Sequence, residues 1–74
     1  MSSGQTPSRR NEQLRARALN GWRAASLLVR ERWELCAQAD RESRPHRFAA
    51  YVAALDREAA AAAELARLSL PRAA

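Results

Sequence analysis

The sequence predicts an all-α fold: an antiparallel two-helix hairpin, with a long helix over about residues 8–39 and a second helix over about residues 45–69. Three observations predict it. Apolar residues recur at helical spacing in two separate stretches. A proline at position 45 divides the stretches, and the segment before it, residues 40–44, is short and polar. Two helices joined by a loop of this length pack antiparallel.

The first helix carries a wide apolar surface. Residues 14–39 contain no proline. At about 100° per residue their apolar side chains cover an arc of roughly 200°, about twice the stripe of an ordinary surface helix. One neighbouring helix cannot cover so wide an arc, so we expect part of it to face something else. The arc consists of Leu14, Ala18, Leu19, Trp22, Ala25, Leu28, Val29, Trp33, Leu35, Cys36 and Ala39.

Asn20 and Gly21 interrupt this stretch, because this dipeptide is typical of turns and helix ends. Either it divides the segment into two helices, or Gly21 lies within one helix and lets a neighbouring backbone approach. The apolar arc keeps its phase across the dipeptide, from Ala18 to Trp22. We therefore expect one continuous helix.

The second helix should begin near Pro45 and end before Pro71, with Arg44 non-helical because a following proline disfavours the helical backbone. Its large apolar side chains form one stripe, which we expect to face the first helix. Leu65 and Leu68 lie off this stripe, on a second and weaker edge. The stripe consists of Phe48, Tyr51, Val52 and Leu55, continued by alanines at 59, 62, 63 and 66 and then by Leu70.

A loop centred near residue 42 predicts the register of the hairpin. Residues whose numbers sum to about 84 should lie at the same level of the two antiparallel helices. Trp33 then lies opposite Tyr51 and Val52, and Val29 lies opposite Leu55. Near the open end, Trp22 meets the alanines at 62 and 63, so large residues face small ones without leaving voids.

The chain is short for a self-sufficient fold. A single domain of 74 residues buries only about 60% of the surface that its unfolded form exposes. Disulfides, a metal or oligomerisation usually stabilise such chains. Cys36 is the only cysteine and His46 the only histidine, so neither a disulfide within the chain nor a zinc site is expected. We expect a hairpin over residues 8–70, completed as a helical bundle, between disordered tails at 1–7 and 71–74.

No motif in the sequence carries chemistry. Glycine occurs only at positions 4 and 21, which excludes a phosphate-binding loop. The acidic residues form no metalloprotease or EF-hand pattern, and Cys36 lies on the apolar arc without an adjacent cation to activate it. We therefore expect no enzymatic activity, no cofactor, no metal and no small-molecule substrate. Without a signal peptide or a membrane-spanning stretch, a cytoplasmic location is expected.

Positive charge gathers at the start of the chain. The chain has 13 arginines and no lysine, and its one histidine is His46. The first 23 residues carry a net charge of +4, out of +5 for the whole chain. Such a segment can contact phosphates or an acidic protein surface. A solvated helix start is the favoured interpretation, because cations at a helix N-terminus are common although they oppose the macrodipole. No aromatic residue lies among the arginines before Trp22, so stacking on bases is not expected. The arginines are Arg9, Arg10, Arg15, Arg17 and Arg23.

The wide apolar arc predicts a small, non-enzymatic protein–protein interaction module, such as an adaptor, a regulator or a small subunit of a complex. Its partner would be a second copy of the chain, giving a homodimer, or another helical protein. Within the arc, Arg32 either extends to the rim or pairs with a carboxylate of the partner. The alternative function is a small DNA- or RNA-binding regulator, and an interfacial membrane peptide ranks last because the second helix is mostly alanine. The residues predicted to form the protein interface are Leu14, Trp22, Leu28, Arg32, Trp33, Leu35, Leu65 and Leu68.

Overall fold

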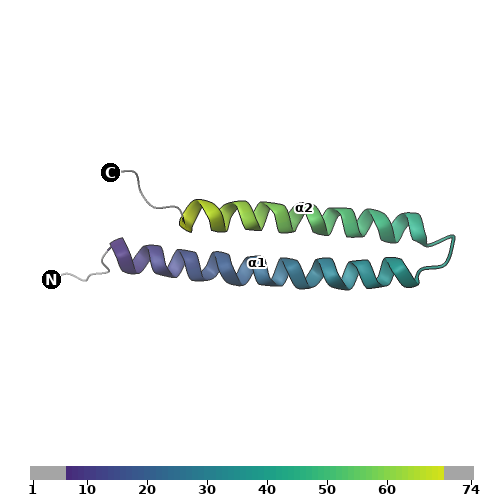
Figure 1. Ribbon diagram of the computed structural model, residues 1–74, viewed down its shortest axis with the longest axis horizontal. Coiled ribbons are helices and arrows are strands. Elements are labelled where there is room, and N and C mark those ends of the chain that lie inside the picture. Colours follow the sequence, from purple (N-terminus) through teal and green to yellow (C-terminus); the bar gives the residue numbers. More distant parts are fainter. Residues whose placement is uncertain (1–6, 70–74) are drawn as a thin grey trace.

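The computed structural model describes residues 7–69, which form an antiparallel hairpin of two helices (Figure 1). Helix α1 spans Pro7–Gln38 and helix α2 spans Arg44–Ser69, and the segment 39–43 reverses the chain between them. The two helices lie side by side along the whole of α2. The all-α hairpin predicted from the sequence is confirmed.

The helix bounds differ from the predicted ones by one residue. Helix α1 begins at Pro7, a residue assigned above to the N-terminal tail, and ends at Gln38. Helix α2 begins at Arg44, so the expectation that Arg44 is non-helical is wrong. The Arg44 N–H donates to the Asp40 carbonyl at 3.0 Å and so starts the first turn before Pro45. The predicted tails otherwise lie outside the described residues.

Helix α1 is continuous through Asn20 and Gly21, as the unbroken phase of its apolar arc predicted. Gly21 does not have a positive φ. A Cβ atom built on Gly21 would meet nothing within 4 Å. Among residues 7–69, therefore, no neighbouring backbone uses the space that this glycine leaves.

Two contacts between side chains confirm the predicted register. The Ser26 hydroxyl donates to Oε2 of Glu58 at 2.7 Å. The rings of Trp33 and Tyr51 lie 5.2 Å apart, inclined at 51°. Both pairs of residue numbers have the sum of about 84 expected for a loop centred near residue 42.

The residues that pack between the helices follow a heptad spacing, alternating steps of three and four residues. Most are half-buried, and of the described side chains only Cys36 and Ala54 are buried, with 6% and 2% of their surface exposed. We call this row the inner seam. It consists of Ala18, Trp22, Ala25, Val29, Arg32 and Cys36 on α1, and of Tyr51, Ala54, Glu58, Ala61, Leu65 and Leu68 on α2.

The face of α2 that meets α1 was therefore predicted incorrectly. Phe48, Val52 and the alanines at 59, 62, 63 and 66 are exposed. Leu65 and Leu68, predicted to lie on an outer edge, are half-buried on the face of Ala54. Helix α2 is rotated so that small Ala54 lies between the helices and Glu58 reaches Ser26, an arrangement that side-chain size alone does not indicate.

The loop contains a local cap that should make stability depend on pH. Oδ1 of Asp40 accepts the Ser43 N–H at 2.8 Å, and this bond lowers the pKa of Asp40 below its usual 3.8. A lowered folded-state pKa stabilises the hairpin above pH 3.8, and this stabilisation is lost as the pH falls below 3.8 through the folded pKa. The midpoint temperature of thermal unfolding should therefore fall less below pH 3.8 for Asp40→Asn than for the wild type. An equal loss would assign the acid sensitivity to other carboxylates.

Candidate protein-interaction surface

The hairpin leaves large apolar side chains in contact with solvent. Six of them have between 38 and 61% of their surface exposed. None lies in the inner seam, although several are next to it on either helix. Their exposure is unusual beside so small a core, because a soluble monomer normally exposes large apolar residues only singly. They are Leu14, Leu27, Trp33, Leu35, Phe48 and Val52.

The residues predicted as the interface fall into two groups. Leu14, Trp33 and Leu35 are exposed and available to a partner. The other five are half-buried in the single chain, because most of them belong to the inner seam or border it. The structure therefore does not bring the eight together as one surface. The half-buried group consists of Trp22, Leu28, Arg32, Leu65 and Leu68.

Sequence reasoning missed Leu27, Phe48 and Val52 as exposed residues. Leu27 lies on the side of α1 opposite the inner seam. Phe48 and Val52 were expected to face α1. The heptad spacing of Ala54, Glu58, Ala61 and the leucines at 65 and 68 is present in the sequence, but Phe48 and Val52 belong to a second row with the same spacing, so spacing alone does not decide which row faces α1.

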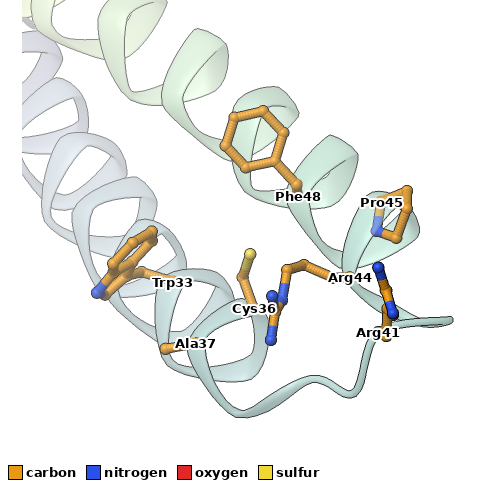
Figure 2. Close-up of a pocket in the computed structure, with 7 residues that line it drawn as sticks. All are labelled: Trp33, Cys36, Ala37, Arg41, Arg44, Pro45 and Phe48. Atoms are coloured by element: carbon orange, nitrogen blue, oxygen red, sulfur yellow. The ribbon is translucent and has the colours of Figure 1, made fainter.

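An open apolar groove of about 630 Å³ lies at the loop end of the hairpin (Figure 2). The rings of Trp33, from α1, and Phe48, from α2, both lie near the Cys36 thiol. Tyr51 supports both rings, at centroid distances of 5.2 Å from Trp33 and 6.1 Å from Phe48. We call this the aromatic groove. Its lining is completed by Ala37, Arg41, Arg44 and Pro45.

Arg41 and Arg44 both line the aromatic groove, with the Arg44 side chain extending toward Cys36 and the Arg41 guanidinium lying near Pro45 (Figure 2). Nη2 of Arg44 donates to the Ala39 carbonyl at 3.2 Å, just beyond the end of α1. Neither arginine has a carboxylate within 4.0 Å among residues 7–69, although the Arg44 charge helps to lower the pKa of Asp40. The groove thus combines apolar walls with a cationic rim.

A smaller groove of about 170 Å³ lies on the other side of the inner seam, where Arg32 is half-buried beside Leu28 and Arg57. Arg32 has no carboxylate within 4.0 Å in the described part of the chain. Pairing within the chain is therefore not how this guanidinium is accommodated. The guanidinium either extends to the rim of the groove or pairs with a carboxylate of a partner, the two alternatives that the sequence left open. The rest of the groove is formed by Ala50, Ala53 and Ala54.

The five arginines of the first 23 residues are exposed on α1. At about 100° per residue they are distributed around the helix, so they do not form a single basic face. By the register of the hairpin, Arg9 and Arg10 lie beyond the level of Ser69, the last described residue of α2.

Residues 7–69 contain neither a cluster of metal-ligating side chains nor a membrane-spanning helix. No group of three His, Cys, Asp or Glu side chains there could hold a metal ion. Neither helix has a stretch long and apolar enough to cross a bilayer. Comparison of the chain with protein-family models, with curated proteins and with solved structures finds no match.

Proposed function

We propose that this chain is a non-enzymatic protein–protein interaction module that acts through its exposed apolar helix faces. One observation carries the proposal: the single hairpin buries only Cys36 and Ala54 among its described side chains, while six large apolar residues remain exposed. An adaptor, a regulator or a small subunit of a complex would use such a surface.

The exposed large apolar residues lie on both helices: Leu14, Leu27, Trp33 and Leu35 on α1, and Phe48 and Val52 on α2. A second copy or another helical protein of the cytoplasm would cover this surface.

Sedimentation equilibrium at micromolar concentrations tests self-association directly. We expect a mass above the 8.2 kDa of one chain, and tryptophan emission that shifts to shorter wavelength as the mass rises. A well-folded species of 8.2 kDa, with no binding partner recovered from its host by affinity purification, would contradict the proposal.

The second candidate is a nucleic-acid-binding regulator, favoured by the exposed arginines of α1. Titration of labelled duplex DNA at two salt concentrations separates the candidates. Phosphate contacts weaken steeply as salt rises. Apolar association between copies that each carry a charge of +5 should instead be maintained or strengthened, because salt screens their repulsion. Absence of binding at low salt would exclude the second candidate.

A further inference from the structure

Helix α2 carries a second heptad row besides the one that packs on α1. Its members alternate in steps of four and three residues, and the row is rotated from the α2 side of the inner seam by roughly 110° about the helix axis. None of its members is charged, and all are exposed except Leu55, which is half-buried. We call this row the outer seam. It consists of Phe48, Val52, Leu55, Ala59, Ala62 and Ala66.

Side-chain size divides the outer seam into two halves. The three large residues lie near the loop, and the three alanines lie toward the open end. If two copies of α2 pack antiparallel, each large residue meets an alanine of the other copy. One register satisfies all three layers, because the residue numbers in each layer have the same sum. The layers are Phe48 with Ala66, Val52 with Ala62, and Leu55 with Ala59.

Parallel packing of the same row gives a poorer fit. It would place Phe48 against Phe48 and Val52 against Val52, while the alanine layers at the other end would leave a gap. Layers of equal total size keep the two helices at one distance along their length and fill the space between them. Layers that change from large to small along the helices do not. Parallel packing would also bring the Arg41 and Arg44 side chains of both copies to the same end, where like charges repel.

We propose that the outer seam binds a second copy of this chain, with the two α2 helices antiparallel. This inference rests on the proposed interaction function and specifies its partner and surface. A two-fold axis near residue 57 relates the copies, the closed arrangement most common in oligomers. The alanine half of one copy then covers Phe48 at the edge of the other's aromatic groove. The four helices form a bundle with the α2 helices paired and the loops at opposite ends.

One contact opposes this arrangement. Asp56 flanks the outer seam close to the two-fold axis, so the Asp56 carboxylates of the two copies lie near each other. Both are exposed, and the repulsion is therefore screened by solvent. Asp56→Asn should strengthen dimerisation slightly.

An exchange of side chains within one layer tests the proposal. Val52→Ala should weaken dimerisation roughly 10- to 100-fold, because it leaves an Ala–Ala void in two symmetric layers. Ala62→Val should weaken it as well, through a crowded Val–Val contact. The double variant restores one valine and one alanine to each layer and should bind within about threefold of the wild type. Leu27→Ala, on the opposite side of α1, is the matched control and should change nothing.

The outcomes separate this inference from the proposed function. Both substituted residues are exposed in the single chain, so circular dichroism should show the same helix content in every variant. If the losses of dimer affinity in Val52→Ala and Ala62→Val add up in the double variant, the two residues do not meet across the interface, and antiparallel pairing is wrong. If the chain dimerises and Val52→Glu does not weaken the dimer, the outer seam is not the interface, although the chain still self-associates. A wild type that stays monomeric at 100 μM would overturn the inference, whereas another recovered partner would preserve the proposed function.

A distance measurement checks the orientation independently. Spin labels on Glu42→Cys, in a Cys36→Ala background, lie at opposite ends of an antiparallel pair. At 1.5 Å per residue from an axis near residue 57, their separation should be roughly 45 Å. A separation of less than half this value would show parallel packing and overturn the proposal.

Discussion

Gly21→Pro should unfold most of the population, or divide α1 into two shorter helices. Proline lacks the N–H that residue 21 donates within the helix, and its ring clashes with the carbonyl of Arg17, at a cost of about 3 kcal/mol or more. A hairpin with only two buried side chains in its described part has little stability in reserve. Far-UV circular dichroism and thermal unfolding would measure the loss.

Gly21→Ala is the matched control and should act in the opposite direction. An alanine Cβ at this position meets nothing within 4 Å, and alanine favours a helix interior over glycine by about 1 kcal/mol. We expect a higher midpoint of thermal unfolding. Equal tolerance of proline and alanine would show that the chain turns at Asn20 and Gly21 instead of continuing as one helix.

Ala54→Asp should be the most damaging change in α2. Ala54 is 2% exposed and lies between the helices, where a carboxylate would lose its water without gaining a partner. Burial of an unpaired charge destabilises by about 3 kcal/mol or more. Urea denaturation would give the change in the free energy of unfolding.

Ala60→Asp provides the comparison, because Ala60 is exposed and lies away from both the inner and the outer seam. Its effect should stay within about 0.5 kcal/mol, as for most surface substitutions. A similar loss for both variants would mean that intrinsic helix propensity, and not packing against α1, decides the outcome.

The sequence contained enough information to predict the hairpin and its register. Spacing of the apolar residues, the proline at 45 and a short loop determine which residues lie level, and Ser26 with Glu58 and Trp33 with Tyr51 confirm it. These features depend on chain geometry and on local backbone preference. They need no knowledge of side-chain packing.

The rotation of α2 about its own axis was harder to predict. Helix α2 carries two heptad rows, and the row with the larger side chains, Phe48 and Val52, was expected to face α1. The structure instead places Ala54 and Leu65 there. Two rows of similar apolar character compete for one neighbour. A polar contact, Ser26 to Glu58, accompanies the smaller row, and size alone does not reveal this preference.

The candidate surface was predicted only in part for the same reason. Leu14, Trp33 and Leu35 are exposed as a partner would require, whereas Leu65 and Leu68 belong to the inner seam. Leu27 could not be anticipated from the apolar arc, because it lies outside it. Whether any of these residues contacts a partner stays a prediction.

The dependence of thermal unfolding on protein concentration tests the central claim most directly, because association with a second folded chain raises the midpoint by mass action. We predict that the midpoint rises by several degrees as the concentration increases from 1 to 100 μM. A high midpoint that stays constant over this range, for a species that sediments at 8.2 kDa, would show that one hairpin is stable alone and would contradict the account.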